Sequence, residues 1–89
     1  MSDDMQAEIK DLYQTILSLQ TEDDCERFFS DLCTYKEINS MAQRLKSAKL
    51  LMDGNTYEQV IKQTDISSAT LSRVSRAVKQ GSGYKKFAK

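Results

Sequence analysis

The 89-residue sequence contains no proline, no tryptophan and no histidine, and only three glycines and two cysteines. So few turn-forming residues favour helices over a sheet protein rich in tight turns. Without histidine, two cysteines do not make a structural zinc site. No apolar run approaches the roughly 20 residues needed to span a bilayer, and we expect no signal peptide before the fold. We therefore predict a helical, cytoplasmic protein with no membrane span and no metal.

Catalytic machinery is also missing from the sequence. There is no glycine-rich phosphate loop, no cluster of metal-ligating residues and no recognisable spacing of nucleophile and base. We therefore predict no catalytic residue and no enzyme. Cys25 and Cys33 lie eight positions apart on one expected helix, about 12 Å along its axis. They are too far apart to bridge each other, and we predict reduced cysteines in the core.

A formal net charge of zero hides a strong asymmetry along the chain. Residues 1–34 carry nine acidic and two basic side chains, whereas residues 56–89 carry seven basic and two acidic ones. Residues 35–55, with four basic and two acidic side chains, are mildly basic. A basic end beside an acidic end is typical of a polyanion-binding face held away from the rest of the molecule. Two ordinary solvated faces are the alternative.

Apolar residues at heptad spacing mark the first expected helix. The seam consists of Met5, Ile9, Leu12, Ile16 and Leu19, and Tyr13 and Leu17 widen it. This broad apolar face predicts packing against a second copy of the chain. Packing against the chain's own core is an equally open interpretation of this segment.

Capping residues mark the next two expected helices. Thr21 precedes an acidic first turn, which favours the helix dipole, and Thr34 with Glu37 forms a capping box. The predicted buried face of the second helix is Cys25, Phe28, Phe29, Leu32 and Cys33. That of the third is Ile38, Met41, Ala42, Leu45, Ala48, Leu51 and Met52, and Gly54 ends this helix.

Residues 56–80 predict two short helices joined by a tight turn. Thr56 and Gln59 form a capping box for the first helix, and Ser67 caps the second. Asp65 occupies the turn position that needs a left-handed backbone, which Asp tolerates better than most residues. The expected buried stripe of the second helix is Leu71, Val74 and Val78.

The outward face of this second helix suits a DNA major groove. Its side chains are Ser68, Ala69, Ser72, Arg73 and Arg76. Small residues let the backbone approach, hydroxyls meet bases or phosphates, and arginine pairs with guanine edges or phosphates. Two alternatives remain open: a hairpin that packs on its own protein, and an interaction module that binds another regulator or a polymerase subunit.

Together these patterns predict an all-α, five-helix fold in one domain, residues 1–89. Residues 1–54 would supply dimerisation helices, 56–80 the helix-turn-helix, and 81–89 a loosely ordered basic tail. A single copy would leave the first helix and the Phe28/Phe29 face poorly covered. An intertwined homodimer would cover both and present two recognition helices to successive major grooves, which predicts a palindromic operator.

The chain resembles the Trp repressor family, and most closely its TrpR-like YerC/YecD branch. The resemblance covers Leu32–Tyr84 and is densest in Asp31-Leu32-Cys33-Thr34, Gln43-Arg44, Leu50-Leu51, Gly54, Thr56-Tyr57-Glu58, Ala69-Thr70-Leu71-Ser72-Arg73-Val74 and Gly81-Ser82-Gly83-Tyr84. It implies an interlocked homodimer that binds double-stranded operator DNA and regulates transcription as a repressor. Ser68, Ala69 and Ser72 would face the groove, with Ser67 and Thr70 beside them. The full set of predicted DNA contacts is Lys62, Ser67, Ser68, Ala69, Thr70, Ser72, Arg73 and Arg76.

The resemblance also locates a candidate effector pocket. In the tryptophan-sensing relatives two arginines sandwich the indole ring, and these correspond to Arg44 and Arg73 here. The pocket threonines correspond to Thr34 and Thr70. The candidate pocket is therefore Thr34, Arg44, Thr70, Arg73, Val74 and Ala77.

Several departures from the family pattern argue against tryptophan as the corepressor. Val74 stands where the tryptophan sensors have a glycine, Ala77 replaces a pocket serine, and Asp65 replaces the turn glycine. The family's last helix would be short or missing. We expect Val74 to fill the indole slot, so that no cofactor is needed. Alternatively, Arg44 and Arg73 serve phosphate contacts or pair with acidic residues.

Overall fold

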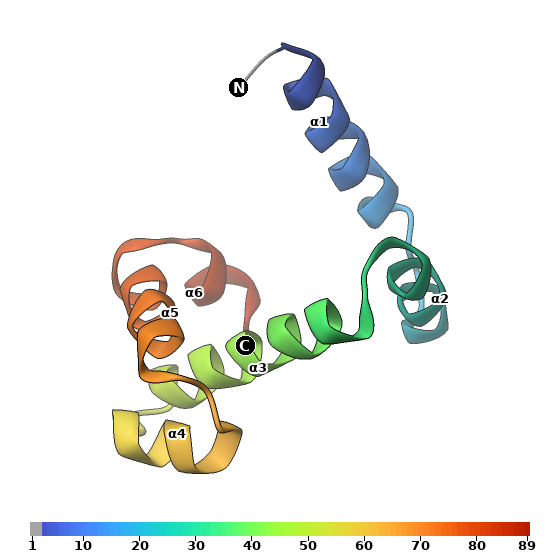
Figure 1. Ribbon diagram of the computed structural model, residues 1–89. Coiled ribbons are helices and arrows are strands. Elements are labelled where there is room, and N and C mark those ends of the chain that lie inside the picture. Colours follow the sequence, from blue (N-terminus) through green and yellow to red (C-terminus); the bar gives the residue numbers. More distant parts are fainter. Residues whose placement is uncertain (1–2) are drawn as a thin grey trace. The chain divides into compact units, whose positions relative to one another are not determined.

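The computed structural model describes residues 3–89, which form six helices and no strand. The helices are α1 (Asp3–Leu17), α2 (Glu22–Leu32), α3 (Tyr35–Met52), α4 (Tyr57–Thr64), α5 (Ser68–Gln80) and α6 (Gly83–Phe87) (Figure 1). The prediction of an all-helical fold is confirmed. The predicted number of five helices is wrong, because the basic tail forms a helix of its own. None of the helices in residues 3–89 has the length and apolarity to cross a membrane.

Contacts divide the chain into two units at the boundary between Thr34 and Tyr35. The boundary coincides with the change in charge, because nine of the thirteen acidic residues precede it and eleven of the thirteen basic residues follow it. The sequence prediction places the third helix, within residues 1–54, among the dimerisation helices. Its contacts place it in the same unit as the helix-turn-helix, since α3 contacts α4, α5 and α6.

The core of the carboxy-terminal unit lies where α4, α5 and α6 meet α3 (Figure 1). Its buried residues are Ala48, Val60, Ile66, Leu71 and Val74, with Leu50, Leu51, Ile61, Val78 and Tyr84 packed against them. Val60 and Leu71 are the largest fully buried apolar side chains. Burial of one such side chain stabilises the fold by about 1.5–3 kcal/mol. This small cluster therefore holds α5 in a fixed orientation on α3.

The predicted buried face of α3 is only partly correct within this unit. Ala48 is buried and Leu51 is half-buried, but Met41, Ala42 and Leu45 are exposed. The helix is 18 residues long, and the core residues it contributes lie in its carboxy-terminal half. The amino-terminal half of α3 therefore presents apolar side chains that nothing in its own unit covers.

A polar network ties α3 to the end of α4. The Thr64 hydroxyl donates to the Val60 carbonyl oxygen at 2.8 Å and accepts from the Ile66 backbone N–H at 3.3 Å. Gln43 donates its side-chain amide to the Thr64 carbonyl oxygen at 2.9 Å. Ser47 is fully buried, and its hydroxyl lies 2.8 Å from the Gln43 carbonyl oxygen and 3.3 Å from the Thr64 hydroxyl. These bonds anchor the residues that lead into the turn between α4 and α5.

The sixth helix corrects the prediction of a loose tail. The Gly81 N–H donates to the Ala77 carbonyl oxygen and caps α5. A Cβ at Gly81 would lie 2.7 Å from that carbonyl oxygen, so this close approach requires glycine. Tyr84 packs against the core and Ala88 is buried, which anchors α6. The Gly-Ser-Gly sequence correctly predicts the end of α5, but it gives no sign of the helix that follows.

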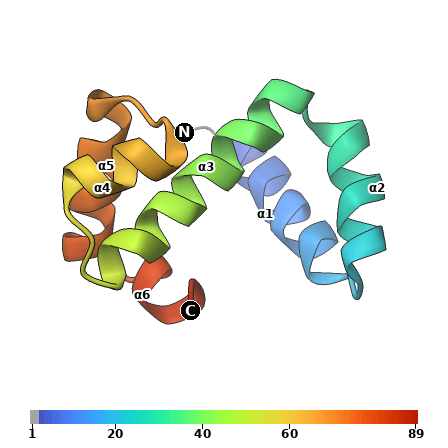
Figure 2. The same ribbon diagram turned by 90° about the horizontal axis from the view of Figure 1, so that it is seen from below.

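The amino-terminal unit contains α1 and α2, joined by residues 18–21 (Figure 2). Thr21 caps α2 by accepting from the Asp24 N–H, as predicted. None of the described residues of α1 or α2 is buried within the chain. The predicted burial of the α2 face is therefore wrong for a single chain: Cys25 and Leu32 are exposed, and Cys33 is only half-buried.

Asp65 supports the geometry of the turn between α4 and α5. It ends α4 with φ 60° and ψ 21°, in the left-handed region, and its N–H donates to the Ile61 carbonyl oxygen at 2.8 Å. The prediction of a left-handed residue here is confirmed. A residue with a Cβ pays about 1–2 kcal/mol for this backbone, and a β-branched residue is the least suited to it.

Replacing Asp65 with valine should lower the free energy of unfolding by about 1–2 kcal/mol, because valine fits the left-handed region poorly. Urea denaturation followed by circular dichroism measures this change. Asp65→Gly is the matched control and should unfold at the same or a higher urea concentration. Equal loss of stability in both variants would show that the Asp65 side chain, and not its backbone conformation, is what matters.

Candidate nucleic-acid interface

The amino-terminal end of α5 is held by a local hydrogen-bond pattern. The Ser67 hydroxyl accepts from the Thr70 N–H at 3.2 Å and donates to the Thr70 hydroxyl at 2.9 Å. Such a cap contributes about 1 kcal/mol to helix stability. Ile66, directly before the cap, is buried in the core. The first turn of α5 therefore starts from a fixed point on the unit.

The core contacts of α5 decide which of its side chains face outward. Leu71 and Val74 are buried as predicted, and Ser75 is also buried. The sequence pattern missed Ser75, because a serine does not stand out as a core residue. Of the predicted DNA contacts, Ser68, Ala69, Ser72, Arg73 and Arg76 are exposed on the remaining surface of α5, where Thr70 is half-buried. Ser67 at the cap of α5 and Lys62 on α4 are also exposed. We call Ser68, Ala69, Ser72, Arg73 and Arg76 the reading face.

The arginines of the reading face have no ion-pair partner among the described residues 3–89. Within residues 3–89 neither Arg73 nor Arg76 forms an ion pair, whereas Arg27 lies 3.6 Å from Asp23 in the amino-terminal unit. Arg44 on α3 is likewise exposed and without an ion pair in this part of the chain. Pairing of Arg44 or Arg73 with an acidic side chain is therefore not seen within residues 3–89 of this single chain. Exposed and uncompensated guanidinium groups are suited to phosphates and guanine edges.

A polar cleft lies beside the reading face, between the start of α4 and one flank of α5. It has a volume of about 310 Å³ and is lined by Tyr57, Ser72, Ser75, Arg76, Lys79 and Gln80. We call it the α4–α5 cleft. Ser72 and Arg76 belong to both the cleft and the reading face. Tyr57, Lys79 and Gln80 are not among the DNA contacts predicted from the sequence, because residues from two helices meet in this cleft.

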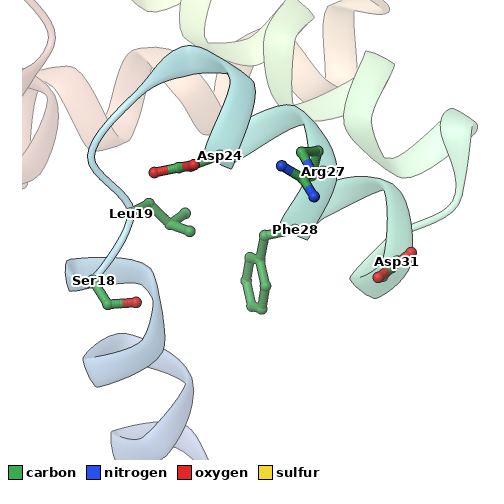
Figure 3. Close-up of a pocket in the computed structure, with 6 residues that line it drawn as sticks. All are labelled: Ser18, Leu19, Asp24, Arg27, Phe28 and Asp31. Carbon is green, nitrogen blue, oxygen red and sulfur yellow. The ribbon is translucent and has the colours of Figure 1, made fainter.

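A different cleft lies in the amino-terminal unit (Figure 3). It has a volume of about 440 Å³ and is lined by Ser18, Leu19, Asp24, Arg27, Phe28 and Asp31. Asp24 already accepts the Gln20 N–H at 3.0 Å, and Arg27 pairs with Asp23. Leu19 and Phe28 add apolar surface to this mixed lining. Its acidic residues make it unsuitable for an anion.

Comparison with known proteins gives a consistent result. The family model described as Trp repressor protein matches residues 7–88. The chain is 49% identical over 74 residues to YerC, an uncharacterised protein of Bacillus subtilis (strain 168). The matched segment covers 83% of this chain and 71% of YerC. This chain belongs to the Trp repressor family. It falls in the branch that contains YerC.

Solved structures of other members share this fold. A TrpR-like protein from Eubacterium eligens ATCC 27750 matches with a TM-score of 0.86 at 43% identity, covering 91% of this chain and 84% of the other. A crystal structure from Staphylococcus aureus, described as a candidate Trp repressor, matches with a TM-score of 0.85 at 40% identity, covering 89% and 80%. The Trp repressor family consists of DNA-binding regulators and not of enzymes.

The residues of the candidate effector pocket have different surroundings. Val74 is 3% exposed and belongs to the core, whereas Arg44, Arg73 and Ala77 are exposed. Thr34 lies in the amino-terminal unit and the other five lie in the carboxy-terminal unit.

Among residues 3–89, no group of three or more histidine, cysteine, aspartate or glutamate side chains forms a possible metal site.

Proposed function

We propose that this member of the Trp repressor family is a cytoplasmic transcriptional regulator that binds a palindromic operator as a homodimer. The observation that carries the proposal is the reading face. Its small polar and cationic side chains are exposed on a helix whose opposite side is locked into the core. Phosphate contacts would position the protein, and base contacts from this face would read the sequence.

The homodimer is supported by the amino-terminal unit. Tyr13, Leu17 and Leu32 are 61%, 82% and 50% exposed within the chain, and no described residue of α1 or α2 is buried. A segment of this length without a buried residue usually needs a disulfide, a metal or a partner chain to hold its fold. Large exposed apolar surface marks an interaction site. A second copy would cover this surface and place two reading faces about one DNA helical turn apart.

Operation without tryptophan is supported by the surroundings of Val74. Val74 is buried in the core, so the protein's own packing would occupy the position where the tryptophan sensors carry glycine. In this proposal Val74 keeps α5 in its reading orientation, and no corepressor is required. Arg44 and Arg73 then remain available for phosphate contacts.

Replacing Arg73 or Arg76 with alanine should each weaken DNA binding by about 1–3 kcal/mol if the arginine contacts a base edge. Gel-shift titration at fixed moderate salt, on an operator selected from random genomic fragments, measures the loss. Lys49→Ala on α3 is the control, because it removes one exposed positive charge away from the reading face. Unchanged affinity in both arginine variants would favour the protein-interaction module instead.

Replacing Leu17 with glutamate should convert the protein from dimer to monomer in analytical ultracentrifugation. Leu17 is exposed in the single chain, so the substitution removes little packing within it, but it would place a charge in the covered face of a dimer. Gln14→Glu adds the same charge at an exposed polar position of α1 and should stay dimeric. A parent protein that sediments as a monomer would contradict the proposed assembly.

Tryptophan should give no saturable heat in a calorimetric titration of the parent protein, and it should not change operator affinity. The reason, in this proposal, is that Val74 occupies the space that glycine leaves open in the tryptophan sensors. Val74→Gly provides the comparison, since it removes that side chain and creates a cavity in the core. Tight binding of tryptophan to the parent protein would contradict the proposed corepressor-free operation.

A further inference from the structure

We propose that the α4–α5 cleft binds one phosphate group of the DNA backbone in each protomer, with Lys79 and Tyr57 as contact residues. This inference rests on the proposed function and adds residues outside the reading face to the interface. The ligand is defined by its chemistry: a phosphodiester group, with one negative charge and oxygen acceptors only.

The lining of the cleft matches such a group. Arg76 and Lys79 supply two positive charges, and Ser72, Tyr57 and Gln80 supply hydroxyl and amide donors. In the described chain, none of the residues that line this cleft is acidic. Pockets that bind drug-sized molecules are mostly apolar, and this lining differs from theirs. It fits an anion, which accepts hydrogen bonds from several donors at once.

The helical spacing of α5 brings these donors to one flank. Ser72, Arg76 and Lys79 follow each other at intervals of four and three residues, so they form one row along the helix. Tyr57 is the first residue of α4 and is 41% exposed. The two helices therefore form two walls of the cleft, and the row on α5 continues directly into the reading face through Ser72 and Arg76.

Two other charged clefts among residues 3–89 lack this combination. The amino-terminal cleft contains Asp24 and Asp31. A cleft of about 260 Å³ near the end of the chain contains Lys49, Lys85 and Lys89, but Asp53 also lines it. Of these three clefts, only the α4–α5 cleft has cationic side chains and no carboxylate in its lining. It adjoins α5, the helix that would enter the DNA major groove. A phosphate bound there would fix the register in which the reading face meets the bases.

The test compares salt dependences of DNA binding. Binding of the parent protein to a random-sequence duplex and to the selected operator is titrated by fluorescence anisotropy over a series of salt concentrations. Lys79→Gln should weaken both complexes on the order of tenfold. It should also reduce the slope of log K against log salt by about 0.9 per protomer, because one phosphate is no longer neutralised.

Two further variants sharpen the comparison. Tyr57→Phe removes only a hydroxyl and should weaken both complexes without changing the salt slope. Lys49→Gln makes the same charge change as Lys79→Gln but in a different cleft, and it should leave the slope at the parent value. Thermal unfolding by circular dichroism should be unchanged in all three variants, because each side chain is exposed.

The outcomes separate this inference from the proposed function. If the parent protein binds neither duplex, the proposed function itself fails. If the parent binds DNA but Lys79→Gln keeps the parent salt slope, only the phosphate site is overturned. The same holds if Lys49→Gln reduces the salt slope as much as Lys79→Gln does. The site would also be reassigned to a free anion if inorganic phosphate caused saturable NMR shifts at the Tyr57 and Ser72 amides at submillimolar concentration.

Discussion

The packing of α5 on α3 fixes the direction in which α5 presents its polar side chains. Leu71 and Val74 enter a core that also contains Ala48, so α5 cannot rotate about its axis without exposing them. The rotation of α5 decides whether serines and arginines or apolar residues face outward. The remaining features of the interface depend on this one contact.

The turn before α5 works together with that contact. Asp65 takes a left-handed backbone, and Thr64 and Gln43 hold the end of α4 against α3. The position of Ser67, and therefore of the first turn of α5, follows from these bonds. Local hydrogen bonds thus set where the helix starts, while apolar packing sets how it is rotated.

The two units differ in charge and in burial. The carboxy-terminal unit is basic and has its own core, whereas the amino-terminal unit is acidic and has no buried residue in α1 or α2. In the proposed dimer the two units have different roles. The exposed apolar helices of the amino-terminal unit join two copies, and the basic carboxy-terminal unit contacts the DNA. The acidic unit would be repelled by DNA phosphates, which favours contact through the reading face.

The sequence by itself determined the local features of the fold, which are the helix caps and the turn. Caps at Thr21, Thr56 and Ser67, and the left-handed Asp65, are local properties, so they could be predicted from a few neighbouring residues. Tertiary structure alone decided the burial of Ser75, the anchoring of α6 and the assembly of the α4–α5 cleft. These depend on which surfaces meet across long stretches of chain. Periodicity shows that Met41 and Leu45 are apolar, but only the fold reveals that their own unit leaves them exposed.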